Sequence, residues 1–206
     1  GTAAFNYLEA LKAQYPELEF ERPAGEAVYR VKGENSDLIL KRALEYYASK
    51  PALNIDGLGE KNVEALVNAN LVKTIADLYR LKAAEVAQLG RFAEVSANKL
   101  VEAIQASKTP TLQRFITALG IRHVGAQTAA TLAEHFADIN QLTQATEDDL
   151  TKLPDIGKVV AESILAWFSD QDNLELLQDL QSLGVAPQFE NKSNFPLFGR
   201  CYIISG

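Results

Sequence analysis

The feature that most constrains the fold of this chain is an internal repeat with a period of about 33 residues. Four segments align without gaps, and they read IDGLGEKNVEALV (55–67), LGRFAEVSANKLV (89–101), IRHVGAQTAATLA (121–133) and LPDIGKVVAESIL (153–165). In each copy the first and fourth residues are large and apolar, the ninth is Ala or Val, and the twelfth is Leu or Ile. Such a repeat indicates one supersecondary unit used four times.

The fifth position of the repeat is the point at which each unit turns. It is glycine in three copies (Gly59, Gly125 and Gly157) and alanine in the second (Ala93). Glycine has no Cβ, so the chain can turn tightly there and bring bare backbone against a ligand. The amphipathic helix that follows presents its first unpaired N–H groups toward the turn, where they suit a phosphate. The pattern therefore predicts a helix–hairpin–helix unit that holds a phosphate of a nucleic-acid backbone.

A protein-binding scaffold is the alternative reading of the same period. Ankyrin and tetratricopeptide repeats also recur at roughly 33 to 34 residues. Their signature residues lie inside helices or in a Thr-Pro-Leu-His turn, and neither pattern occurs in this sequence. A helical scaffold for protein partners stays open at this stage, but the phosphate-binding hairpin is favoured.

The rest of the chain completes the expected domain organisation. The stretches between the repeats read as capped helices, residues 170–183 as a closing amphipathic helix, and residues 187–196 as a polar linker. Near the N-terminus AVYRVKG alternates like a strand and SDLILKRALEYYAS reads as a capped helix. We expect a mainly α protein, in which a tandem domain of four hairpins (53–186) follows a small α+β segment (1–52) and precedes a linker with one strand (187–206).

Composition limits the function classes further. The formal net charge of −7 is unlike the basic footprint of a generic nucleic-acid binder, although backbone N–H groups can hold phosphates without a basic surface. No apolar run reaches the roughly 18 residues of a membrane span, so we expect no membrane partner and a cytoplasmic location. The single cysteine, Cys201, excludes an internal disulfide. Because the chain lacks methionine and starts at Gly1, we expect it to be an internal piece of a longer protein.

Several segments together resemble one protein family. FITALGIRHVGAQTAATLAEHF, KLPDIGKVVAESILAWF, SKPALNIDGLGEKNVEALV and GEAVYR look like the helix–hairpin–helix region of bacterial NAD-dependent DNA ligases and the segment before it. FGRCYIISG resembles the first strand of the BRCT domain that closes these enzymes. The resemblance implies a zinc-finger segment, four hairpins and the start of a BRCT domain. It also implies a parent enzyme that seals nicks in DNA during replication and repair, using NAD and magnesium.

The chain departs from the family in its first segment. Aligned back from GEAVYR, the four zinc cysteines of the family would fall at Ala13, Pro16, Val31 and Ser36. None of these residues is a thiolate, and a structural zinc site needs about four donors. We therefore expect no metal in this segment. His123 and His135 are too sparse to form a metal site without cysteines.

One short stretch imitates an adenylation site. NIDG (54–57) resembles the Lys-x-Asp-Gly box of ligases, but Asn54 stands where the nucleophilic lysine is required. Asp56 and Gly57 also belong to the repeat, so we interpret the box as a coincidence. The sequence shows no carboxylate pair, Ser-His-Asp set or phosphate-binding lysine loop. We predict no catalytic residue and no cofactor bound by this chain itself, and NAD and magnesium would belong to the rest of the parent.

Nine residues of the hairpins are predicted to contact DNA. They are Gly57, Gly59, Lys61, Arg91, Arg122, His123, Gly125, Gly157 and Lys158. The glycines would admit the phosphate, and the cations would pair with it. A solvated surface role is the alternative for each cation, and an ordinary surface histidine is the favoured alternative for His123. The expected partner is duplex DNA with a nick, bound by a monomer without sequence preference, and a module of another repair or recombination protein is the alternative function.

Overall fold

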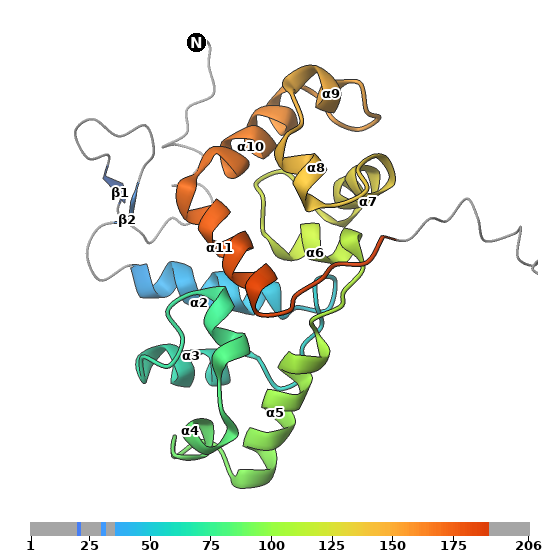
Figure 1. Ribbon diagram of the computed structural model, residues 1–206. Coiled ribbons are helices and arrows are strands. Elements are labelled where there is room, and N and C mark those ends of the chain that lie inside the picture. The colour runs from blue at the N-terminus through green and yellow to red at the C-terminus, as the bar shows by residue number, and fades with distance from the viewer. Residues whose placement is uncertain (1–19, 22–29, 32–35, 190–206) are drawn as a thin grey trace, which may run out of the picture.

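The computed structural model describes residues 20–21, 30–31 and 36–189 (Figure 1). Two short antiparallel strands, β1 (Phe20–Glu21) and β2 (Arg30–Val31), pair Phe20 with Val31 and Glu21 with Arg30. The predicted strand AVYRVKG contains β2. Ala13 and Pro16, two of the positions aligned with zinc cysteines, lie outside the described residues.

Helices make up most of the remaining described chain. In chain order they are α2 (Ser36–Tyr47), α3 (Glu60–Asn68), the 3-10 helix η2 (Ile75–Arg80), α4 (Ala83–Ala87), α5 (Glu94–Ala106), α6 (Leu112–Ala118), α7 (Ala126–His135), α8 (Ile139–Thr143), α9 (Glu147–Thr151), α10 (Lys158–Ser169) and α11 (Gln171–Ser182). The predicted mainly α class is confirmed. The closing helix predicted over 170–183 is α11, with Asp170 as its N-cap and Gly184 (φ 95°) just beyond its end.

Four pairs of packed helices coincide with the four repeats. We call them hairpin 1 (α2 and α3), hairpin 2 (α4 and α5), hairpin 3 (α6 and α7) and hairpin 4 (α9 and α10), and the two helices of each pair contact one another. In Figure 1 hairpins 1 and 2 form the lower part of the molecule and hairpins 3 and 4 the upper part. Helix α2 contacts α6, and α11 contacts η2, so these helices join the two parts.

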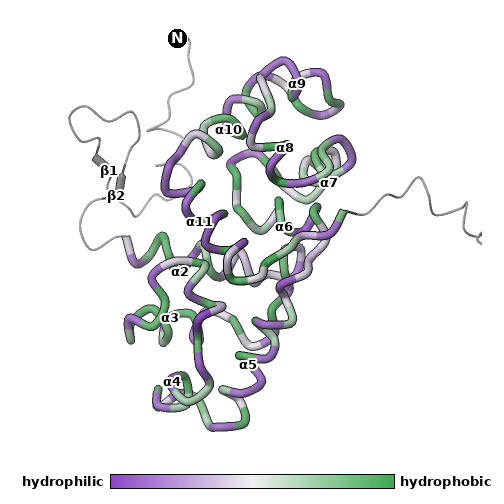
Figure 2. Tube along the Cα trace, in the orientation of Figure 1, coloured by the Kyte–Doolittle hydropathy of each residue, from purple (hydrophilic) through white to green (hydrophobic). Residues whose placement is uncertain are grey.

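The repeated apolar positions form the core. All four fourth-position residues are at most 7% exposed, and the ninth and twelfth positions are at most 2% exposed in every copy. Hydrophobic and hydrophilic residues alternate along most helices in Figure 2, as expected for helices that bury one face. At roughly 1.5–3 kcal/mol for each fully buried large side chain, this periodic burial is the main source of stability.

Hydrogen bonds that the sequence pattern does not predict also connect segments that lie far apart in the chain. The Arg114 guanidinium on α6 donates through Nη1 to the backbone oxygens of Lys50 and Ala52, both at 2.8 Å. The segment after α11 runs beside the segment before α6: the Gln188 amide donates to the Pro110 carbonyl, and the Gln188 carbonyl accepts from the amide of the first α6 residue. Part of the predicted linker is therefore hydrogen-bonded to the domain.

The expected domain boundary at residue 52 runs between two helices that pack together. Leu44 and Tyr47 of α2 are fully buried, and α2 contacts α3. Helix α2 thus contributes to the hairpin core rather than to a separate core. No helix in the described part of the chain is long and apolar enough to cross a membrane.

Candidate nucleic-acid interface

The four turns that connect the paired helices share one backbone design. In each turn the amide of the fourth residue donates to the carbonyl of the first, with lengths of 3.4, 2.9, 3.0 and 3.3 Å from hairpin 1 to hairpin 4. The fifth residue is the N-cap of the second helix in all four, and its carbonyl accepts the first helical bond at 2.9–3.0 Å. The four turns therefore share one hydrogen-bonding pattern.

The three N-cap glycines are not required by the fold itself. Gly59, Gly125 and Gly157 have φ of −93°, −92° and −89° with extended ψ, a conformation open to any residue, and Ala93 adopts it in hairpin 2. A Cβ built on any of the three glycines meets no described heavy atom within 4 Å. A Cβ at these positions would therefore not crowd the turn itself. The open space lies outside the protein, where a ligand would approach.

The first turns of the hairpin helices offer backbone donors at this surface. No side chain of the described residues caps α3, α7 or α10 at the fifth position of the repeat. The first N–H groups of a helix carry a partial positive charge and need acceptors. Exposed glycines beside them give an anion unobstructed access. These three hairpins therefore suit phosphate oxygens.

The third turn residue adds a left-handed backbone in the same three hairpins. Gly57, His123 and Asp155 have φ of 86°, 67° and 66°. A left-handed residue within a turn can make successive N–H groups converge on a concavity that binds anions. In His123 and Asp155 this conformation is adopted without glycine's freedom, and it costs on the order of 1–2 kcal/mol.

Hairpin 2 departs from this design at both points. Neither Gly90 nor Arg91 has a positive φ. The amide of Ala93 donates to Ser96 Oγ at 2.9 Å, and Ser96 Oγ donates in turn to the Ala93 carbonyl at 3.0 Å. Its turn amide is thus already used within the chain, so this hairpin suits phosphate less well than the other three.

Three of the four predicted cations, Lys61, Lys158 and Arg91, take two kinds of position. Lys158 is the first residue of α10 and Lys61 the second of α3, and both are exposed. A cation at a helix N-terminus opposes the helix dipole by roughly 0.3–1 kcal/mol, and a bound anion there would reverse this cost. Arg91 Nε instead donates to Asn62 Oδ1 at 2.6 Å. Arg91 therefore differs from the two lysines, because its side chain is hydrogen-bonded within the protein rather than placed at a helix N-terminus.

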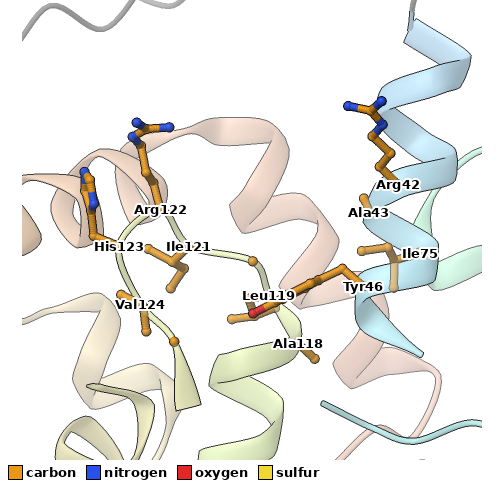
Figure 3. Close-up of a pocket in the computed structure, with 12 residues that line it drawn as sticks. Arg42, Ala43, Tyr46, Ile75, Ala118, Leu119, Ile121, Arg122, His123 and Val124 are labelled. Carbon is orange, nitrogen blue, oxygen red and sulfur yellow. The ribbon is translucent and has the colours of Figure 1, made fainter. Parts of the chain in front are cut away.

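Arg122 and His123 lie at a pocket between hairpin 3 and α2. The pocket has a volume of about 830 Å³, and Arg42 and Tyr46 of α2 line it from the other side. Figure 3 shows the side chains of Arg42, Arg122 and His123 extending to the same side of this pocket, with Val124 pointing away from them. Burial, and secondarily the positive charge of Arg122, lower the pKa of His123. Its imidazole is therefore predominantly neutral at pH 7.

Sequence reasoning missed Arg42 and Tyr46, because they lie outside the repeats and no spacing points to them. The nine residues that the sequence did predict all lie at the turns. Arg122 is half-buried, and the other eight are exposed: Gly57, Gly59, Lys61, Arg91, His123, Gly125, Gly157 and Lys158. Asn54 is an exposed left-handed residue (φ 51°) just before the turn of hairpin 1. Within the described ranges no group of three or more His, Cys, Asp or Glu residues is arranged to hold a metal ion.

Comparison with known proteins places these turns in a known class. Residues 49–106, which include hairpin 2 and the α3 side of hairpin 1, match the family model of a SAM-like helix-hairpin-helix tandem. Residues 114–177 match that of the helix-hairpin-helix motif, across hairpins 3 and 4. The two matches identify tandem helix–hairpin–helix motifs in this chain, as predicted.

Full-length relatives narrow the class further. The chain is 45% identical over 186 residues to a DNA ligase of Hahella chejuensis, covering 88% of this chain and 27% of the relative. It is 42% identical over 190 residues to a DNA ligase of Shewanella frigidimarina (90% and 28%) and 41% identical over 183 residues to one of Syntrophotalea carbinolica (88% and 27%). The chain is therefore homologous to DNA ligases and fits a C-terminal part of an NAD-dependent DNA ligase. It spans about a quarter of the length of these relatives.

Proposed function

We propose that this chain binds duplex DNA through backbone phosphates, without sequence preference, as the DNA-binding part of a DNA ligase. The homology to DNA ligases and the two helix–hairpin–helix matches support the class of partner. Phosphate contacts position a protein on the duplex but carry no sequence information. This suits an enzyme that must act at a break in any sequence.

One observation carries the proposal: three hairpin helices begin at an exposed glycine that the fold does not need. Glycine is a better N-cap than alanine, but it leaves the unfolded chain more entropy to lose, and neither φ nor a contact with described atoms requires it at these positions. The same position accepts alanine in hairpin 2. A ligand that approaches the backbone closely gives the three glycines a purpose, and a phosphate is the ligand that helix N-terminal amides prefer.

The nicked duplex is the finer part of the proposal. A ligase must hold the DNA on both sides of the break, and hairpins at opposite ends of the molecule offer contacts to more than one stretch of backbone (Figure 1). We assign the adenylation chemistry, with its NAD and magnesium, to the remainder of the parent protein. Asn54, in place of a lysine amine, supplies no nucleophile for AMP transfer. The chain would act as a monomer in the cytoplasm.

Fluorescence anisotropy with intact, nicked and branched duplexes at low salt tests this function. The informative variant is Gly59→Ala/Gly125→Ala/Gly157→Ala, which adds three methyl groups on the proposed DNA face. Gly90→Ala is the matched control, because a Cβ there also meets no described atom within 4 Å and Gly90 is not an N-cap.

The triple variant should bind duplex DNA at least about tenfold more weakly at a temperature at which circular dichroism shows it to be folded. Its melting temperature should fall by several degrees, because alanine is a poorer N-cap than glycine. The control should bind like the wild type. Wild-type binding that is undetectable at about 50 mM salt, or equal affinity for the triple variant, would contradict the proposal. A preference for branched over nicked duplexes would favour a module of another repair protein.

A further inference from the structure

Hairpins 1 and 2 are joined through their turns by a short chain of hydrogen bonds. Arg91, the third turn residue of hairpin 2, donates from Nε to Asn62 Oδ1 at 2.6 Å. Asn62, on the first turn of α3, donates from Nδ2 to the carbonyl of Gly57 at 2.6 Å. Gly57 is the left-handed residue of the hairpin 1 turn. One side chain of hairpin 2 is therefore connected to the backbone that shapes hairpin 1.

The amide side chain of Asn62 is well suited to transmit this connection. Its oxygen accepts from the guanidinium while its nitrogen donates to the Gly57 carbonyl, so both ends of one planar group are used. A hydrogen bond from a charged donor is stronger than a neutral one. Fixing Asn62 in this way restrains the Gly57 carbonyl, and with it the backbone that leads into the helix at Gly59.

Hairpin 2 meanwhile lacks what the other hairpins offer to an anion. Its turn has no left-handed residue at Gly90 or Arg91, and Ser96 accepts the Ala93 amide. The pocket between the two hairpins, about 890 Å³ in volume, is lined by Arg91 and Lys99 but also by Asp56 and Glu102. The two carboxylates offset the two cations, so the pocket offers no net attraction for phosphate.

We propose that Arg91 is a positioning residue: through Asn62 it holds the hairpin 1 turn in its phosphate-binding form, and hairpin 2 itself holds no phosphate. The inference rests on the proposed function and deepens it. It differs from the sequence-based hypothesis that Arg91 pairs directly with DNA. In the resulting arrangement hairpins 1, 3 and 4 contact the backbone, and hairpin 2 supports hairpin 1.

Arg91→Lys separates the two roles, because lysine keeps the positive charge but lacks the Nε donor of arginine. A direct phosphate contact largely survives this change, whereas the Asn62 connection does not. Asn62→Ala removes the same connection from its other end. Arg80→Lys and Asn98→Ala are the matched controls, since Arg80 pairs with Asp77 away from the hairpin turns and Asn98 is exposed on α5.

DNA affinity should be measured for these variants in two backgrounds, the wild type and Gly59→Val, in which the hairpin 1 contact is already obstructed. In the wild-type background Arg91→Lys and Asn62→Ala should each weaken binding about three- to tenfold, the equivalent of one lost hydrogen bond. In the Gly59→Val background each should change affinity less than about twofold. The controls should be neutral in both.

A second measurement needs no DNA. The Leu58 amide donates to the Ile55 carbonyl within the hairpin 1 turn, so its hydrogen exchange reports the order of that turn. Arg91→Lys and Asn62→Ala should both accelerate it, while Val124 in hairpin 3 should be unaffected. Unchanged Leu58 exchange would overturn the inference even if no DNA binding were seen.

Binding results would overturn it in a different way. If Arg91→Lys binds like the wild type while Arg91→Ala is weak, and if Arg91→Ala still weakens binding in the Gly59→Val background, Arg91 contacts phosphate itself. Wild-type protein that fails to bind DNA would refute the proposed function, whereas wild-type binding with neutral Asn62→Ala would refute only the positioning role.

Discussion

At the scale of single residues, two buried tyrosines show how buried hydroxyl groups in the core are hydrogen-bonded to one another. The Tyr47 and Tyr79 hydroxyls lie 2.7 Å apart, and the Tyr79 hydroxyl is 3.0 Å from Ser107 Oγ. Ser107 Oγ in turn donates to the Ile104 carbonyl. Burial, together with the neighbouring Tyr79, raises the pKa of Tyr47 far above its usual value, so its phenol stays protonated. These bonds link α2, η2 and the end of α5.

The two hydroxyls are not equivalent, which gives a prediction. Tyr79→Phe leaves the fully buried Tyr47 hydroxyl without the partner it has here, and should lower the free energy of unfolding by about 1–3 kcal/mol. Tyr47→Phe removes that hydroxyl and leaves Tyr79 bonded to Ser107, so the loss should be about 0.5–1.5 kcal/mol. Urea denaturation of both variants checks the order. A larger loss for Tyr47→Phe would contradict it.

His123 gives a pH-dependent prediction at the same scale. Because the pKa of His123 is lowered in the folded protein, the folded state binds fewer protons than the unfolded state as the pH falls below about 6.5. The free energy of unfolding should therefore decrease from pH 7 to pH 5, and His123 contributes to this decrease. His123→Asn removes the titrating ring and tolerates the left-handed backbone. Urea denaturation at both pH values should show a smaller decrease in the variant; an unchanged decrease would argue against this role.

At the scale of elements, Arg114 joins hairpin 3 to the end of the α2 region. Both acceptors are backbone carbonyls, and one guanidinium nitrogen serves them together. Arg114→Ala should lower the free energy of unfolding by about 1–3 kcal/mol, since hydrogen bonds from charged donors are worth more than neutral ones. Arg80→Ala, which removes exposed ion pairs with Asp77 and Asp179, should cost under about 1 kcal/mol. Thermal denaturation of both variants compares them, and equal losses would show that Arg114 does not join the elements.

The elements themselves were largely predictable from the sequence. Each repeat places a buried residue at the fourth, ninth and twelfth positions. Because these positions face the core in every copy, they are apolar in every copy and the period can be read from the sequence. The connections between elements were not predictable. The Arg91–Asn62 bond and the pairing of Gln188 with Pro110 join residues far apart in sequence, and no local spacing encodes such partners.

The candidate site likewise has features that were predictable from the sequence and features that were not. The exposed glycines of the turns follow from the repeat, because the alignment itself separates Gly59, Gly125 and Gly157 from Ala93. The left-handed backbone at His123 and Asp155 was not foreseen, since neither residue type requires it. Arg42 was missed because it reaches the site through packing of α2 rather than through the repeat.

At the scale of the whole molecule, an acidic protein is proposed to bind a polyanion. The formal net charge of −7 repels DNA at long range, so attraction must come from the local donors of the turns and the cations beside them. Salt screens both effects beyond about 10 Å at 0.1 M. Affinity should therefore be modest, and much of it should come from the release of counterions from the few phosphates that are contacted.

The salt dependence of binding measures that number. With three hairpins in contact, and up to about eight phosphates once neighbouring cations are included, the logarithm of the association constant should fall with the logarithm of salt concentration with a slope of roughly −3 to −7. Lys158→Ala should make the slope shallower by about one, because it removes one cation beside a phosphate. Lys73→Ala, an exposed lysine before η2 and outside the hairpin turns, is the control and should leave the slope unchanged. Titrations between about 50 and 200 mM salt give the slopes; a flat dependence, or equal changes for both lysines, would mean that the hairpin turns are not where this protein meets DNA.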